Sequence, residues 1–280
     1  MFDFRYHALS LVAVFLALGI GIVLGASLGD SVISQANKDV RSSLRDDVVN
    51  ARVDARTAKA AVANRDDFIK AAWPRLAAGK LKGKRVAIVS DGSLPQEVES
   101  AVRSAVKDAG GRIDSVSRFD AQPDTVAIGN KLGSRFALLG TNEGQLRPLT
   151  RRLGRALVFG RSPALKLESA FPDDFSGDFR GADAVVFYRA DAKRDDQAER
   201  FEAALVEGLR ASGVPVVGTE RSDEDPSQIP FYVHAGISTV DDADQPAGRV
   251  ALALALAGAD GNFGFKSTAD SPLPERARGR

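Results

Sequence analysis

The sequence predicts an α/β protein: an N-terminal transmembrane helix, a long coiled-coil-like helix, then a mostly parallel sheet with helices on both faces. Three observations predict this. Residues 8–29 carry no charge, residues 31–73 lack glycine and proline and repeat their apolar positions, and strand-like and helix-like segments alternate after Gly83. We expect four parts: a short tail and transmembrane helix (1–30), a stalk helix (31–80), an α/β domain outside the cytoplasm (83–265) and a disordered tail (266–280).

Residues 8–29 form the predicted membrane span. At about 1.5 Å per residue they reach roughly 33 Å, which is enough to cross a hydrocarbon core of about 30 Å. A cleaved signal peptide is an alternative, because Gly25, Ala26 and Ser27 would suit a cleavage site, but its apolar core is usually shorter and its start more basic. A buried helix of a soluble protein is less favoured, because nothing else in the sequence resembles a core able to surround it.

Small residues recur at every fourth position of this span and therefore lie along one ridge of the helix. Gly21 and Gly25 form the spacing that allows two membrane helices to approach closely. Small residues are also common in membrane helices in general, but their regular spacing favours a helix-pairing face. Its predicted members are Ala17, Gly21, Gly25 and Gly29.

A narrow apolar stripe runs along the predicted stalk helix. Between Val40 and Ile69 the apolar positions recur about every 3.6 residues, on a helix of roughly 60 Å. So narrow a stripe buries too little surface for the helix to persist alone, so we expect it to pair. A parallel homodimer through the span and the stalk is the favoured interpretation, and a helix folded back onto the globular domain is the alternative.

Charge leaves the membrane orientation open. Arg5 precedes the span, whereas Lys38, Arg41 and Arg45 follow it, and by the positive-inside rule this would place the C-terminal part in the cytoplasm. Asp30, however, is the first residue after the span, and the short N-terminal tail is typical of a signal anchor. We favour a large domain outside the cytoplasm, because a short N-terminal tail of this kind stays inside when a chain inserts as a signal anchor. The charges alone do not decide the orientation.

The alternation after Gly83 predicts one sheet domain. Buried strands are predicted from runs of aliphatic residues, and helices from apolar positions at helical spacing. We expect strands at 84–90, 113–119, 183–189, 214–218 and 236–240, and helices after Pro95, at 195–211 and at 247–257.

Composition and motifs argue against an enzyme. The net charge is +1 and there is no cysteine, so we expect no nucleic-acid partner, no disulfide and no thiol chemistry. The loop Asp91-Gly92-Ser93 follows the first strand, where such sheets bind ligands, but it lacks the glycine-rich phosphate fingerprint. His7 and His234 are isolated, and no nucleophile can be paired with a base. We predict no catalytic, cofactor or metal residues.

An acidic cluster lies near the last predicted helix. Asp241, Asp242 and Asp244 could hold a hard cation through their oxygens. Such residues more often cap a following helix, which here begins near Pro246, and we favour capping.

A basic cluster centred on Arg147, Arg151, Arg152 and Arg155 also includes Arg135 and Arg161, with Glu143 as the one acid among them. It could contact anionic lipid headgroups, an acidic envelope polymer or a partner protein. A solvated helix face paired with Glu168, Asp173, Asp174 and Asp178 explains it equally well.

Both ends of the chain resemble a known family. The segment from Phe4 to Gly25, FRYHALSLVAVFLALGIGIVLG, is similar to the start of the actinobacterial copper transporter (MctB) family, and Ser238 to Asp244 with Gly248-Arg249 is similar to its C-terminal signature. The resemblance implies a single-pass cell-membrane protein with its domain outside the cytoplasm. It also implies a role in copper homeostasis or efflux, and a link to cell division through envelope partners that control wall hydrolysis at the septum.

The residues fit a copper carrier poorly. Cu(I) prefers Cys and Met, and Cu(II) prefers clustered His, but here Met1 is the single methionine and the two histidines are far apart. One helix per chain cannot enclose a conduit. Two hypotheses therefore stand: a dimeric, membrane-tethered scaffold that binds an envelope or septal partner, and a component of copper transport in which copper is implied by the family name alone.

Overall fold

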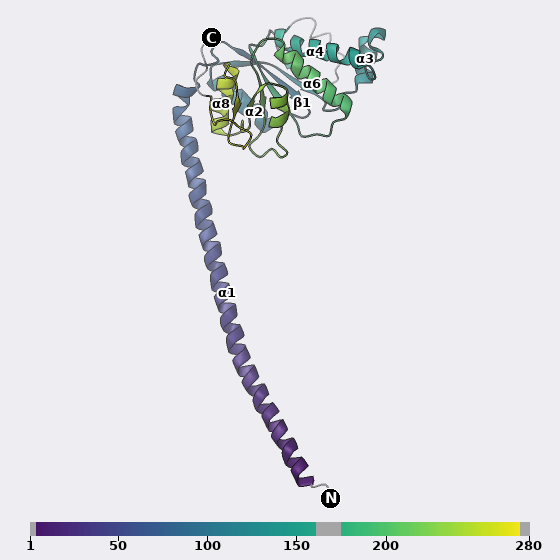
Figure 1. Ribbon diagram of the computed structural model, residues 1–280. Helices are drawn as coiled ribbons and strands as arrows, with labels where there is room; N and C mark the ends of the chain where they lie inside the picture. The colour runs from purple at the N-terminus through teal and green to yellow at the C-terminus, as the bar shows by residue number, and fades with distance from the viewer. Residues whose placement is uncertain (1–3, 161–174, 275–280) are drawn as a thin grey trace. The chain divides into compact units, whose positions relative to one another are not determined.

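The computed structural model describes residues 4–160 and 175–274, without the side chains of 4–5, 26–39 and Pro74 (Figure 1). The chain forms two units, residues 1–65 and 66–280. Gly29, Arg161, Glu168, Asp173 and Asp174, which the sequence analysis singled out, lie outside the residues or side chains described.

The first unit is part of one continuous helix, α1 (Phe4–Leu76), which also contributes its last turns to the second unit. The predicted span and stalk are therefore segments of the same helix, with no break at residue 30. Within the described residues, one stretch, Tyr6–Gly25, is long and apolar enough to cross a membrane, with a mean hydropathy of 2.6. Residues 31–73 contain neither glycine nor proline, so no helix breaker interrupts the helix after the apolar stretch.

The second unit contains a seven-stranded sheet in the order β3-β2-β1-β4-β5-β6-β7. Every pairing is parallel except that of β2 with β3, which is antiparallel. The expected mostly parallel α/β sheet is confirmed. The strands are β1 (Arg85–Asp91), β2 (Arg112–Phe119), β3 (Phe175–Gly177), β4 (Ala184–Arg189), β5 (Val216–Thr219), β6 (Ser238–Val240) and β7 (Asn262–Phe263).

Helices cover both faces of this sheet because successive strand residues point to opposite sides (Figure 1). In β1, Val86 and Ile88 belong to one core, and Ala87 and Val89 to the other. The first core is closed by α2 (Gln96–Asp108) and α8 (Pro246–Leu256). The second is closed by α3 (Thr125–Leu132), α4 (Glu143–Phe159), α6 (Asp196–Arg210) and α7 (Ile229–His234), with the short 3-10 helix η1 (Ser134–Phe136) between α3 and α4.

The last turns of α1 form part of the sheet domain. Ile69 and Trp73 pack against the first core, and the Trp73 indole Nε1 donates a hydrogen bond to the Asp108 carbonyl oxygen at 3.4 Å. Trp73 is the single tryptophan of the sequence, so it reports on the packing of this domain.

The predicted disordered tail is wrong for residues 266–274. Lys266 Nζ donates to Glu220 and to the carbonyl oxygens of Arg221 and Glu224, and Ser271 forms a bridge with Phe263. The polar composition of this segment favoured disorder. In the folded chain, however, the buried carboxylate of Glu220 neutralises the charge of Lys266, and these two residues are far apart in the sequence. Residues 275–280 lie outside the described part.

Candidate functional site

The carboxyl ends of β1 and β4 form the point where the strand order reverses, which is where doubly wound sheets bind ligands. Asp91 ends β1 and Arg189 ends β4. In this chain the position is filled by the protein itself: the Arg194 side chain, 2% exposed, reaches into it from the loop before α6.

Arg194 is held by several acceptors at once. Its Nη2 lies 2.7 Å from Asp91 Oδ2 and donates to the carbonyl oxygen of Ala190 at 3.0 Å. Its Nε donates to Asp91 Oδ2 at 2.8 Å, and its Nη1 to the carbonyl oxygen of Ala192 at 2.9 Å. A fork of five donors satisfies these acceptors in a way that a lysine could not.

Glu202 brings a second buried carboxylate to the cluster. Its Oε1 accepts a hydrogen bond from Arg189 Nε at 2.7 Å, and its Oε2 lies 3.5 Å from Arg194 Nε. The Arg189 guanidinium lies 4.6 Å from the centre of the Phe231 ring, a cation–π contact that covers the outer side of the cluster.

Burial dominates the titration of the two acids. Removal from water and then the neighbouring Asp91 carboxylate raise the pKa of Glu202 to about 8, against the opposing effect of Arg189 and Arg194. Burial also raises the pKa of Asp91, although Arg194 acts against it. The two carboxylates, buried close together, therefore both resist ionisation.

This arrangement locks the ends of β1 and β4 together and fills the space directly between them with the Arg194 side chain. At Gly92, with φ of +89°, an added Cβ would lie 2.7 Å from Ala190 Cβ, so the loop after β1 packs directly against the end of β4. The Asp91-Gly92-Ser93 loop is therefore structural here. A shallow hollow remains outside it, lined by Ser93, Asp120 and Asp191 among others.

Neither Arg194 nor Glu202 was predicted from the sequence to be a site residue. A signal for Glu202 was present, since Ala198, Glu202, Leu205 and Leu209 share one face of the predicted helix 195–211 and all are buried. A charged residue on an apolar helix face indicates a buried partner. Nothing in the sequence identified Arg194 as that partner.

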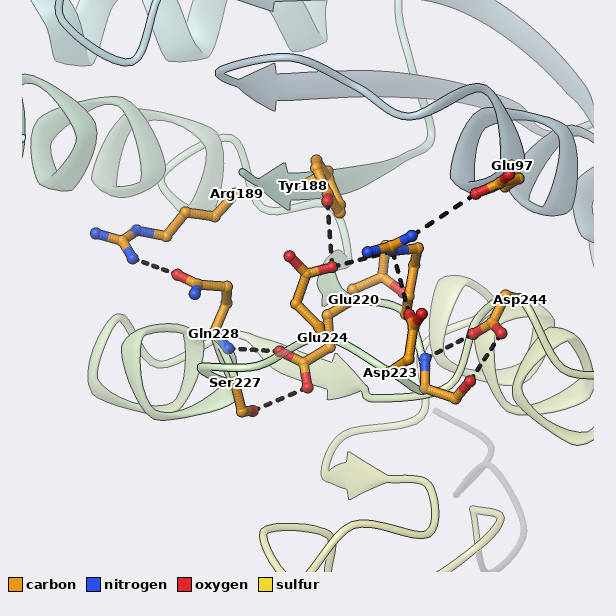
Figure 2. A network of polar contacts seen from close by, with 12 residues as sticks. Glu97, Tyr188, Arg189, Glu220, Asp223, Glu224, Ser227, Gln228 and Asp244 are labelled. Carbon is orange, nitrogen blue, oxygen red and sulfur yellow. Dashed lines mark hydrogen bonds and ion pairs between the residues drawn. The ribbon is translucent and has the colours of Figure 1, made fainter. Parts of the chain in front are cut away.

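A second polar network ties the neighbouring loops together (Figure 2). Arg221 lies 3.3 Å from Glu224, 3.4 Å from Asp223 and 3.7 Å from Glu97 of α2. The hydroxyl of Tyr188 donates to Glu224 at 3.4 Å, and burial raises the pKa of that hydroxyl well above its usual range. The buried Glu220 accepts from Ser227 and from the amide of Gln228. These contacts stabilise the loops around the ends of β4 and β5.

The acidic cluster neither caps α8 nor forms a cation site among the described residues. The N-cap of α8 is Gln245, which makes no side-chain cap hydrogen bond, so the favoured capping role is wrong. Asp241 instead accepts from the amides of Phe265 and Lys266, at 3.0 and 2.9 Å, and Asp244 accepts from the amide and hydroxyl of Ser222. Asp242 is buried beside them. Asp241 and Asp244 therefore hold loops in place.

Glycine makes this close packing possible. An added Cβ at Gly248 would lie 1.9 Å from the Asp242 carbonyl oxygen, and one at Gly264 would lie 1.8 Å from Asp241 Oδ1. Only a residue without Cβ fits at either position.

The basic cluster lies on the solvent side of α4. Arg147, Arg151, Arg152 and Arg155 are all exposed. Arg147 and Arg151 pair with Glu207 of α6 at 3.2 and 3.3 Å. Of the acidic stretch that the sequence suggested as a partner, Asp178 is the described member, and it pairs with Arg180 at 3.4 Å.

The helix-pairing ridge is open in this single chain. An added Cβ at Gly21 or Gly25 would meet no atom within 4 Å. His7 and His234 are both exposed, and the described residues contain no group of three His, Cys, Asp or Glu placed to hold a metal ion.

Comparison with known proteins decides the family. A family model described as "Copper transport outer membrane protein, MctB" matches residues 1–143 and 175–274, which is most of the chain. The chain belongs to the MctB family. Similar proteins named "Copper transporter MctB" occur in Mycobacterium bovis and in two strains of Mycobacterium tuberculosis. Each is 28% identical over 299 residues, covering 91% of this chain and 92% of the relative.

The resemblance inferred from the two ends is thus confirmed, and it extends over most of the sheet domain. The MctB match spans the apolar helix, the stalk and the strands that build the Arg194 cluster. The family description names transport of copper and no catalysed reaction. This MctB-family chain carries no cysteine and one methionine, Met1.

Proposed function

We propose that this chain is a membrane-anchored, dimeric scaffold of the cell envelope, whose α/β domain lies outside the cytoplasm and binds an envelope partner. The observation that carries the proposal is the exposed apolar stripe of α1. Val40, Leu44, Val48 and Val62 are between 45 and 58% exposed in the single chain. Their helical spacing places them on one side, where a second copy would cover them.

The small residues of the predicted span also support pairing with a second copy of this chain. A ridge of small residues with open space above Gly21 and Gly25 allows a second helix to approach closely within the membrane. The span and the stalk belong to one continuous helix. A single parallel pair would therefore cover both the ridge of small residues and the apolar stripe.

The closed sheet edge supports binding through a surface rather than through a small ligand. Arg194 fills the position that a nucleotide or similar molecule takes in related sheet topologies. The domain would then act by presenting its outer helices to another protein. The family resemblance suggests septal proteins that control wall hydrolysis as the class of partner.

Self-association of the full chain in membranes tests the scaffold. Gly21→Ile with Gly25→Ile should weaken dimerisation by about tenfold or more, because the added side chains keep the two backbones apart. Gly19→Ile, compared with the single variant Gly21→Ile, is the matched control, since each adds one isoleucine side chain and Gly19 lies off the ridge. Unchanged dimerisation in the double variant would reject the close-packed pair.

Copper transport is the second candidate, favoured by the printed names of the relatives. The donor set opposes it, because soft ligands are lacking and a conduit needs several helices or a closed wall. Copper titration of the purified full chain separates the two. Stoichiometric, submicromolar binding would favour transport, and absence of binding would favour the scaffold.

A further inference from the structure

We propose that the solvent face of α4 is the docking surface of the domain, and that its occupant is an acidic segment of another protein. The inference rests on the proposed scaffold function and specifies its partner. The surface is formed by Arg147, Arg151, Arg152, Arg155 and Phe159, here called the arginine stripe.

Helical spacing makes the stripe continuous. Arg147, Arg151 and Arg155 are four residues apart and so lie on one side of α4, about 6 Å from one to the next. Phe159 extends the same row at the end of the helix, and Arg152 lies beside it. All five side chains are exposed.

The stripe has more positive charge than its surroundings neutralise. Arg147 and Arg151 share one carboxylate, that of Glu207. Arg152 and Arg155 have no carboxylate within ion-pair distance among the residues that the structure describes. Within residues 4–160 and 175–274, four guanidinium groups thus face one acid, Glu207, and the excess favours a negatively charged occupant.

The helix that carries the stripe is firmly held. Leu146, Leu149, Leu153 and Leu157 bury the opposite side of α4 in the second core. Gly154 and Gly208 permit close contact with α6, because an added Cβ at Gly154 would lie 2.5 Å from the Leu205 carbonyl oxygen and one at Gly208 would lie 2.4 Å from that of Arg151. A firmly held helix lowers the conformational-entropy cost of binding a partner.

The end of the stripe favours a protein over a lipid or a polymer. Phe159 is 56% exposed, and the Arg155 guanidinium lies 5.9 Å from the centre of its ring. Arginine and aromatic side chains are the residues that most often dominate protein–protein interfaces, and a planar guanidinium binds a carboxylate with two hydrogen bonds. An acidic helix with carboxylates at every fourth position would match the 6 Å step.

Photo-crosslinking in the native membrane tests this surface. The full chain carries the photoreactive amino acid benzoylphenylalanine in place of Phe159, or of Phe265 as the control, since both side chains are 56% exposed. We expect a discrete protein adduct from position 159 alone. Mass spectrometry of the adduct should place several Asp or Glu residues within about three helical turns of the crosslink.

Reversing the charge of two arginine residues provides a second test of this surface. Arg152→Glu with Arg155→Glu should reduce the adduct by about tenfold or more, because two attractive contacts become repulsive. Lys80→Glu with Lys107→Glu makes the same change of net charge at exposed positions elsewhere in the domain and should leave the yield unaltered. A lipid or glycan adduct, a crosslinked peptide without acidic residues, a second copy of this chain as the partner, or a yield indifferent to charge reversal would each overturn the proposal.

Self-association is measured on the same samples, so the two proposals fail separately. A dimer without the adduct leaves the scaffold standing and removes the arginine stripe as its docking surface. A monomer that still forms the acidic adduct rejects the dimeric scaffold and retains the surface.

Discussion

Arg194 Nη2 lies 2.7 Å from Asp91 Oδ2 at the carboxyl edge of the sheet, and the two side chains are each 2% exposed. The loop before α6 thereby fills the crevice between β1 and β4 with the protein's own charge. A buried pair of this kind stabilises the fold little in net terms, because its attraction is offset by desolvation, but loss of one partner is costly. This relationship makes the sheet edge a structural lock.

Arg194→Met is expected to destabilise the domain by about 3–5 kcal/mol, because it leaves Asp91 and Glu202 buried without their shared cation. Thermal unfolding of the full chain in detergent, followed by Trp73 fluorescence, should show a midpoint lower by roughly 10 °C. Arg103→Met breaks the exposed pair with Glu99 and should cost less than about 1 kcal/mol. Equal shifts for both variants would contradict the lock.

Glu202 should make the domain less stable as pH rises. Burial raises its pKa to about 8, above the unfolded value, so the folded state holds more protons between about pH 5 and pH 8. The free energy of unfolding then falls across this window by roughly 2–4 kcal/mol.

Glu202→Gln, which is neutral at every pH and similar in shape, should flatten this dependence and raise stability above about pH 8. Trp73 fluorescence during denaturation at several pH values provides the measurement. Glu207→Gln on the exposed side of the same helix is the control, and a slope that survives in Glu202→Gln would assign it to another group.

Asp241→Ala should release the C-terminal segment. The Asp241 carboxylate accepts the amides of Phe265 and Lys266, and its removal leaves both without that acceptor. We expect trypsin to cleave after Lys266 at least about fivefold faster, because local opening precedes cleavage. Asp260→Ala, at an exposed position, should cleave like the parent chain; faster cleavage in both would refute the specific role of Asp241.

The apolar stripe of α1 predicts that charged substitutions on this side of the helix weaken self-association. Leu44→Asp with Val48→Asp places two carboxylates on the exposed apolar side of α1 and should weaken self-association by about tenfold or more. Ala60→Asp with Asn64→Asp adds the same charge on the opposite side of the helix and should have little effect. Analytical ultracentrifugation in detergent measures both, and equal losses would argue against this side as the contact.

Much of the fold follows from local patterns, and the missed parts have identifiable causes. The strands that end in Asp91 and Arg189 each contain a continuous apolar run, as buried parallel strands require. Helix α4 was missed because Gly144, Pro148 and Gly154 interrupt its sequence. Strands β3 and β7 have three and two residues, too few to show a period.

The candidate sites were harder to predict than the fold. The arginine residues of α4 were recognised, but their partner Glu207 lies more than fifty positions further along the chain. Asp241 and Asp244 were recognised as a cluster, and their roles depended on amides contributed by other loops.

Local sequence patterns were enough to predict the long apolar N-terminal helix, its charged continuation and the mostly parallel sheet, because run length and period are properties of neighbouring residues. Which charges are buried together depends on the folded arrangement of distant segments. Arg194 and Asp91 are about a hundred positions apart, and the energy that pairs them arises from burial at a sheet edge that exists only after the chain has folded.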